Sequence, residues 1–151
     1  MRLLVFFILV FTCSSKGLCQ KDDSSNIYLI SLTSHLEYLK SVNKKSLESV
    51  YVEKNEVTAE GLPGQIDGTR VLYLTRSEIR EKTHKGKRIE LIVVRPVVVK
   101  SKSIKVTVID FSVTSKKNNF NYANGGGSTF EFTYNCDLQK FELTNKKQGG
   151  I

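Results

Sequence analysis

Histidine and cysteine, which serve most often as zinc ligands and in nucleophilic catalysis, are rare in this 151-residue chain, which has two histidines and three cysteines. Beyond residue 19 the histidines and cysteines are His35, His84 and Cys136, which are far apart in the sequence. Zinc sites normally show a Cys-x-x-Cys pair or two histidines at helical spacing, and neither pattern occurs here. The sequence therefore predicts no metal site and no other cofactor.

Nucleophilic catalysis needs a cysteine or serine held beside a histidine and a third orienting group. No Gly-x-Ser-x-Gly elbow occurs, and Cys136 stands next to Asp137 in a predicted turn, with neither histidine nearby in the sequence. We interpret Cys136 as a strand-end residue that packs locally and leaves the protein a monomer. The alternative is an intermolecular disulfide, which an unpaired cysteine can form in an oxidising compartment.

Three consecutive glycines, 125–127, invite comparison with a phosphate-binding loop. That loop continues with Gly-Lys-Ser/Thr and a helix, whereas Ser128 to Phe132 has the pattern of a strand. Glycine here would permit positive φ or a close backbone approach. As a functional alternative, this loop and the preceding Phe120 and Tyr122 rim the open end of a sheet cavity.

Asp110 is the one acid within the apolar segment 104–113. A carboxylate buried on a strand is a candidate general base, so Asp110, Glu131 or His35 could serve a small acid–base enzyme. A cavity is expected between the sheet and the helix that carries Leu29 and Leu36. Its candidate lining residues are His35, Tyr38, Asp110, Phe120, Tyr122 and Phe132.

The chain has 23 basic and 15 acidic residues. The basic residues gather at 80–88, at 100–105 and in two Lys doublets at 116–117 and 146–147. Such a surface could attract anionic glycan, lipid or nucleic acid. Glutamates at 78, 81 and 90 interrupt the first group and no RNA-binding signature accompanies it, so a solvated face is the simpler interpretation and nucleic acid is disfavoured.

The first nineteen residues have the pattern of a cleaved secretory signal. Arg2 supplies the positive end, residues 3–11 are uninterruptedly apolar, and Gly17 and Cys19 are the small residues before a cleavage site at Gln20. The apolar run is too short to span a bilayer. A lipoprotein signal would use Cys13 or Cys19, but Thr12 and Leu18 fit poorly before a lipidated cysteine. We expect a secreted or periplasmic protein with one domain, residues 20–151, and no transmembrane segment after cleavage.

Apolar spacing and capping residues locate the helices. Leu29, Leu32, Leu36 and Leu39 recur every three or four residues and predict a helix over 27–42, capped by Ser24, Ser25 or Asn26. The capping-box spacing in 75–78 predicts a second, short helix from Arg76 to about His84.

Runs of β-branched and aromatic residues predict strands at 49–53, 71–74, 89–99, 104–113, 129–134 and 141–143, the second of which could instead lead into the helix. Pro96 implies a bulge or an edge, and a change of phase near Val108-Ile109 implies another bulge. Residues 115–128 should form a long connection and 145–151 a tail. The predicted fold is α+β: the N-terminal helix packs on a curved antiparallel sheet of about four to six strands, with a second short helix.

This order of elements resembles the nuclear transport factor 2-like superfamily, cystatin-like in its broader sense, in which a long helix lies across a curved antiparallel sheet. The Cys-Gln at the end of the signal, the turn at 134–137 and the ending Gln148-Gly149-Gly150-Ile151 also look like small uncharacterised secreted proteins of Gram-negative bacteria. The resemblance covers residues 25 to 147 and carries no functional residue over, because such folds host many functions.

The sequence favours a non-enzymatic binding module for a small apolar ligand or an envelope partner. Two alternatives stay open at this point. One is the small acid–base enzyme, and the other is a basic surface protein that binds anionic glycan, lipid or nucleic acid.

Overall fold

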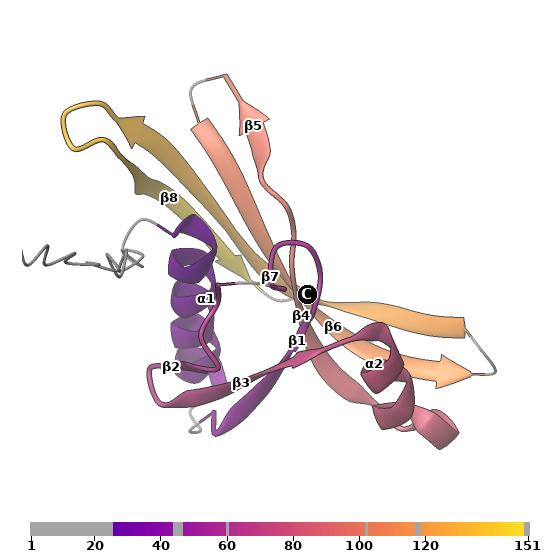
Figure 1. The fold of residues 1–151 in the computed structure, drawn as a ribbon. Helices are drawn as coiled ribbons and strands as arrows, with labels where there is room; N and C mark the ends of the chain where they lie inside the picture. The colour runs from indigo at the N-terminus through magenta and orange to yellow at the C-terminus, as the bar shows by residue number, and fades with distance from the viewer. Residues whose placement is uncertain (1–25, 44–46, 60, 102, 117–118, 150–151) are drawn as a thin grey trace, which may run out of the picture.

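A long helix and a twisted sheet dominate the computed structural model, which describes residues 26–43, 47–59, 61–101, 103–116 and 119–149 (Figure 1). The predicted signal peptide, residues 1–19, lies outside the described residues, as do the two possible lipidation sites. Among the helices that are described, none is long and apolar enough to cross a membrane.

Two α-helices, one 3₁₀ turn and eight strands make up the described part of the chain. The helices are α1 (Ile27–Asn43) and α2 (Arg76–Lys82), and the 3₁₀ turn is η2 (His84–Gly86). The strands are β1 (Ser49–Glu53), β2 (Gln65–Ile66), β3 (Thr69–Leu74), β4 (Ile89–Val94), β5 (Val98–Lys100), β6 (Ser103–Lys116), β7 (Asn119–Asn135) and β8 (Lys140–Gly149).

All these strands belong to one sheet in the order β2-β3-β1-β4-β6-β7-β8, with β5 also beside β6. β1 runs parallel to β3 and β4, and the other pairs are antiparallel. The predicted α+β class is confirmed, but the all-antiparallel sheet of about four to six strands is wrong. The sheet has more strands because β2 was not predicted and because the predicted strand over 89–99 is divided into β4 and β5. It is also longer in the direction of its strands, since 119–128 and 145–149, which lack β-branched residues, extend β7 and β8. The described residues of the predicted connection and tail therefore lie in strands.

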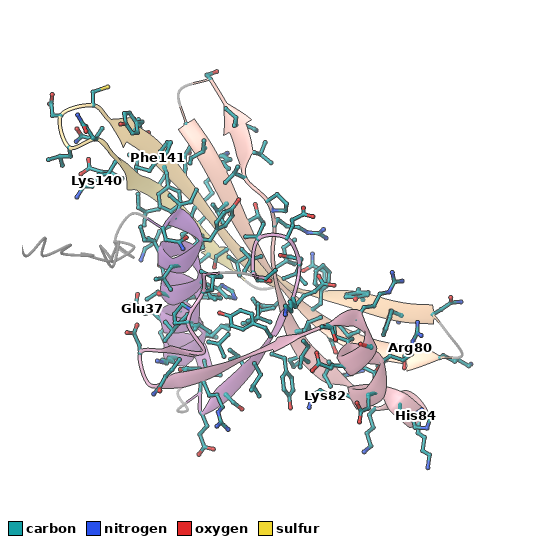
Figure 2. All side chains as sticks on the ribbon, in the orientation of Figure 1. Glu37, Arg80, Lys82, His84, Lys140 and Phe141 are labelled. Carbon is teal, nitrogen blue, oxygen red and sulfur yellow. The ribbon has the colours of Figure 1, made fainter. Side chains whose placement is uncertain are left out.

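Helix α1 follows its predicted bounds closely because its determinants are local. The side chain of Asn26 accepts hydrogen bonds from the backbone N–H groups of Tyr28 and Leu29, which caps the helix. Leu32 and Leu36 are fully buried against the sheet, and Glu37 points away from it (Figure 2). The core beneath α1 also contains Val52, Ile66, Val71, Ile92, Val94, Val106, Val108, Phe130 and Phe132.

Helix α2 covers the other face of the sheet, which the sequence did not predict. Its capping box is present: Thr75 accepts from the N–H of Glu78, and the Glu78 carboxylate accepts from the N–H of Thr75 at 2.7 Å. The Thr75 hydroxyl also donates to the Glu78 carboxylate at 2.6 Å, and this bond, together with the one from the Thr75 N–H, lowers the pKa of Glu78. Ile79 packs in a second core with Leu74, Leu91, Val93 and Val113.

Strand β4 is apolar on both faces because it contributes to both cores. Leu91 and Val93 belong to the core beneath α2, whereas Ile92 and Val94 belong to the core beneath α1. The predicted strand over 89–99 is interrupted around Pro96, as its missing N–H requires. β4 and β5 lie on either side of this interruption and both pair with β6.

A bulge divides β7 into two halves. Asp110 lies opposite Gly126 and Phe111 lies opposite Asn124, so Gly125 is an extra residue in β7. The predicted bulge was placed in β6 near Val108-Ile109, whereas the extra residue belongs to the partner strand. An apparent change of phase in one strand can thus arise without a bulge when both faces of that strand are buried.

The extra residue inverts the alternation of side chains along β7. Phe120 and Tyr122 lie on the α2 side, where Tyr122 packs edge-on against Phe111. Phe130 and Phe132 also have even numbers, but they lie on the α1 side and are fully buried. One bulge therefore lets a single strand supply aromatic residues to two cores.

Gly127→Ala should destabilise the protein by about 1–3 kcal/mol, as overpacking does. A Cβ at this position would overlap the carbonyl oxygen of Val108 on the neighbouring strand. Gly149→Ala is the matched control, because no described atom lies within 4 Å of its Cβ. Its effect should stay within about 0.5 kcal/mol. Urea unfolding measures both, and equal losses would contradict the close approach at Gly127.

Candidate functional site

A chain of three hydrogen-bonded side chains lies between α1 and the sheet. The His35 ring is fully buried, with Nδ1 2.7 Å from the Ser128 hydroxyl and Nε2 2.9 Å from the Asp110 carboxylate. Ser128 is 3% exposed, whereas the Asp110 side chain is 21% exposed. Asp110 is therefore the member of the chain that reaches solvent.

The fold brings these residues together from three elements. Leu32 and Leu36 are one helical turn apart on the buried face of α1, and His35 lies on the same face. On the sheet, Asp110 lies opposite Gly126 and Ser128 lies opposite Val108, so their side chains occupy the same face of adjacent strands. The bulge at Gly125 is required for the contact between Ser128 and His35, because without it the Ser128 side chain would point toward α2.

The hydrogen-bond pattern assigns the roles of the two ring nitrogens. An ionised Asp110 can only accept, so Nε2 carries the proton and donates to it. Nδ1 is then free to accept from the hydroxyl of Ser128. The carboxylate thus orients the imidazole, and the imidazole orients the serine.

A serine, a histidine and an aspartate in a chain are the parts of a hydrolase triad, but the accessibility is reversed. In a triad the serine oxygen faces the substrate, and the carboxylate is buried behind the histidine. Here Ser128 is buried and Asp110 is open. The arrangement can present a fixed carboxylate to a ligand, and it cannot present a nucleophilic serine.

A hollow of about 450 Å³ opens beside Asp110. β1 and β4 pair only at Tyr51–Leu91 and Val52–Ile92, and the residues that precede these pairs contribute to the hollow. Its lining residues are Leu39, Leu47, Ser49, Val50, Tyr51, Glu90, Leu91, Ile92, Asp110 and Gly125. The wall is therefore largely aliphatic, with two carboxylates.

Of the predicted cavity residues, Asp110 alone is among those that line this hollow. His35 contacts Asp110 directly, and the ring of Tyr38 lies 6.4 Å from that of His35, centroid to centroid, but neither residue belongs to the lining. Phe132 is fully buried in the core beneath α1 and does not line the hollow.

Phe120 and Tyr122 were predicted to rim this cavity, and that prediction is wrong. They lie on the α2 side and line a separate hollow with Glu53, Arg76 and Asn119. Burial, together with the nearby Glu53 carboxylate, raises the pKa of Tyr122. The cause of the error is the bulge, because the prediction treated 115–128 as a loop rather than as a strand with a change of face.

Glu131 is not available for acid–base chemistry in this hollow either. It alternates with Phe130 and Phe132 and so points to the opposite face of β7. The hydroxyl of Ser103 donates to its carboxylate at 2.7 Å, which lowers the pKa of Glu131. A lowered pKa makes a carboxylate a weaker base.

Sequence reasoning missed Ser128 and Glu90. A signal for Ser128 was present, since it precedes Phe130 and Phe132 at spacings of two in a strand pattern, and this places it on their buried face. Glu90 was treated only as a charge that interrupts a basic group. Its place in the hollow depends on β1, a distant segment, so no local pattern indicates it.

Two further observations concern the sequence predictions for a metal site and for Cys136. Within the described residues no three His, Cys, Asp or Glu side chains gather closely enough to hold a metal ion. Cys136, for which local packing was predicted, is exposed with a free thiol in the turn between β7 and β8.

Comparison with protein-family models, with curated proteins and with solved structures finds no match for this chain. The resemblance to the nuclear transport factor 2-like superfamily therefore stays a prediction.

Ser128→Ala should lower the free energy of unfolding by about 1–3 kcal/mol, because it leaves the buried Nδ1 of His35 without its partner. Ser112→Ala is a suitable control. The Ser112 hydroxyl is buried and has no hydrogen-bond partner among the described residues, so its removal should cost about 0.5 kcal/mol or less. Urea unfolding compares the two, and equal costs would show that the His35–Ser128 bond contributes no stability.

Proposed function

We propose that this protein is a non-enzymatic binding module whose ligand enters the hollow beside Asp110. The ligand class we infer has a small apolar body and a cationic head. The single observation that carries this proposal is the Asp110 carboxylate, held in place by a buried histidine, at a wall of which half the lining residues are aliphatic. Small-molecule sites commonly combine apolar walls with a few fixed polar groups.

The acidic residues that line the hollow support a ligand with a cationic group. The protein carries a formal charge of +8, yet the described residues that line this hollow include Asp110 and Glu90 and no Lys or Arg. A cationic group would meet two carboxylates there, while an anion would be repelled. The Leu39, Leu47 and Ile92 side chains would contact the apolar body.

His35 supports binding by fixing the carboxylate before the ligand arrives. Oδ1 of Asp110 accepts from Nε2 of His35, which leaves Oδ2 for the ligand. A polar group that is already oriented loses less conformational entropy on binding than one that must be ordered by the ligand. The hydrogen bond from Ser128 to His35 thus helps to hold the partly exposed Asp110 carboxylate in position.

A second candidate is a small acid–base enzyme, in which Asp110 would accept a proton from a substrate. The direct Asp110–His35 contact favours it, since a carboxylate–imidazole pair can also move protons. The two candidates differ in outcome: a binding module returns its ligand unchanged, and an enzyme does not.

Octylammonium should bind more tightly than octanol, and octanoate should bind least, because the three share a chain and differ in the charge of the head. Asp110→Asn should weaken octylammonium binding about tenfold, equivalent to about 1.4 kcal/mol, and leave octanol binding unchanged. Calorimetric titration measures all three ligands.

Asp137→Asn is the matched control for Asp110→Asn, because it removes the same charge from an exposed turn. The proposal is contradicted if octanoate binds as tightly as octylammonium or if the two variants lose equal affinity. Mass spectrometry of the recovered ligands would reveal chemical change and so favour the enzyme.

We also propose that the module works after secretion, with residues 1–19 removed. The mature chain then loses Arg2 and Lys16 and keeps 21 basic and 15 acidic residues, a formal charge of +6. Intact-mass measurement of protein exported by its own host should give a chain that starts at Gln20. A start at Cys13 or Cys19 with added acyl mass would identify a lipoprotein instead.

A further inference from the structure

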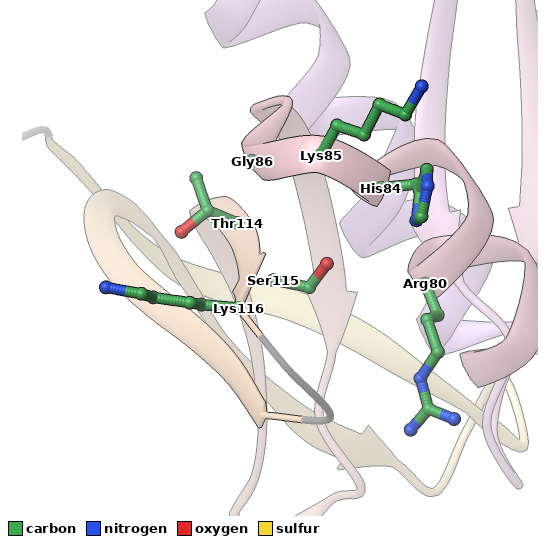
Figure 3. Close-up of a pocket in the computed structure, with 7 residues that line it drawn as sticks. All are labelled: Arg80, His84, Lys85, Gly86, Thr114, Ser115 and Lys116. Carbon is green, nitrogen blue, oxygen red and sulfur yellow. The ribbon is translucent and has the colours of Figure 1, made fainter.

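A second hollow, of about 700 Å³, lies between η2 and the end of β6 (Figure 3). Its lining residues are Arg80, His84, Lys85, Gly86, Thr114, Ser115 and Lys116. It shares no residue with the hollow beside Asp110, and its charge is of the opposite sign.

The floor of this basic hollow is fixed by hydrogen bonds between hydroxyl groups. Thr83 is fully buried, and its hydroxyl donates to that of Ser115 at 2.8 Å. The Ser115 hydroxyl in turn donates to the backbone carbonyl of Thr83 at 3.0 Å. Lys85 and Gly86 then turn the chain with positive φ angles of 58° and 75°. The hydrogen bonds join the residue that precedes η2 to β6, on opposite sides of the hollow.

The cations that line the basic hollow are unpaired. Arg80, Lys85 and Lys116 come from α2, η2 and β6, and in the described part of the chain none of them forms a salt bridge with a carboxylate. No acid is among the lining residues. An adjacent hollow differs, because Lys82, Lys87 and Arg88 line it together with three glutamates, Glu78, Glu81 and Glu90.

Arg80 is held by an aromatic ring rather than by an acid. Its guanidinium lies 5.5 Å from the centre of the Phe120 ring, and that of Arg76 lies 5.6 Å from the same ring. A cation–π contact restrains the side chain and leaves its positive charge available to an anion. Phe120, which the cavity prediction misplaced, thus positions a charge at this second hollow.

The charged groups do not converge on one point. In Figure 3 the side chains of Lys85, Lys116 and Arg80 extend in three different directions, away from one another. A lone phosphate therefore cannot contact all three at once. A ligand that uses them all must carry anionic groups at separate positions on a body that fills the space between them. The volume of about 700 Å³ is within the range of small-molecule sites.

From this geometry we infer that the basic hollow binds a sugar or cyclitol that carries two or more phosphate groups at separate positions. Each phosphate would meet a cation at the rim, and the ring would lie against the aliphatic stems and the hydroxyl of Thr114. Such a group can be free in solution or can be the headgroup of a lipid. This site is independent of the ligand proposed for the hollow beside Asp110.

The test compares ligands that differ in phosphate number and source. Fructose 1,6-bisphosphate should bind at least about tenfold more tightly than fructose 6-phosphate, and its affinity should fall as salt rises. Vesicles of phosphatidylcholine with and without phosphatidylinositol 4,5-bisphosphate provide the lipid arm. Calorimetry measures the sugars and co-sedimentation measures the vesicles. The arm with the higher affinity identifies the source.

The double variant Lys85→Gln/Lys116→Gln should weaken binding of the tighter ligand about tenfold or more, because it removes two of the three charges. It leaves Arg80 on Phe120 undisturbed. Lys140→Gln/Lys147→Gln is the matched control: it removes two charges from β8, and Lys140 lies at the opposite end of the molecule from Arg80 (Figure 2). Its effect should stay within about twofold.

Three results would overturn the inference. The first is that neither the bisphosphate nor the bisphosphate-containing vesicles bind to the wild-type protein. The second is that the monophosphate binds as tightly as the bisphosphate. The third is that both double variants lose equal affinity, which would indicate attraction by net charge alone.

Discussion

The single extra residue in β7 is the constraint on which most of this structure depends. Gly125 has no partner on β6. As a result, the even-numbered side chains of β7 point toward α2 before the bulge and toward α1 after it. Helix α1 can then pack on Phe130 and Phe132, while Phe120 supports the basic side chains of α2. An uninterrupted alternation would send all these aromatic rings to one side and leave the other helix without them.

The buried chain from Ser128 through His35 to Asp110 adds specificity that apolar contacts cannot supply. A stripe of leucines can pack on a sheet of valines in several similar positions, because hydrophobic burial is not directional. Both nitrogens of the His35 ring, in contrast, are satisfied in one placement of α1 only. Any shift would leave a buried polar group unpaired, which is costly. The same contacts that position the helix also orient the carboxylate in the hollow.

The sequence predicted local features well and long-range pairing poorly. The cap at Asn26, the leucine stripe of α1 and the capping box at Thr75 depend on residues within one or two turns, and all are present. The first half of β7 was predicted as a loop because its Asn and Gly residues disfavour strands, but fourteen residues of β6 already form its template.

The candidate site shows the same division between local and distant signals. His35 and Asp110 could be named individually, since each is a polar residue in an apolar pattern. Their contact with each other and with Ser128 could not be predicted, because it depends on the packing of a helix across a sheet. The positions of Phe120 and Tyr122 depend on one bulge at Gly125, whose glycine neighbours the sequence analysis assigned to a loop rather than to a strand.

The position of α1 at the beginning of the chain has a consequence for the time at which the protein can fold. His35 precedes its partners Asp110 and Ser128 by 75 and 93 residues, so α1 is synthesised long before the strands that cover its leucines. Contacts between distant residues form slowly, and β1 must also wait for the parallel strands β3 and β4. The sheet that buries α1 therefore cannot be completed until β6 and β7 have been made. Under the secretion that we propose, this delay would keep the chain competent for passage through a membrane.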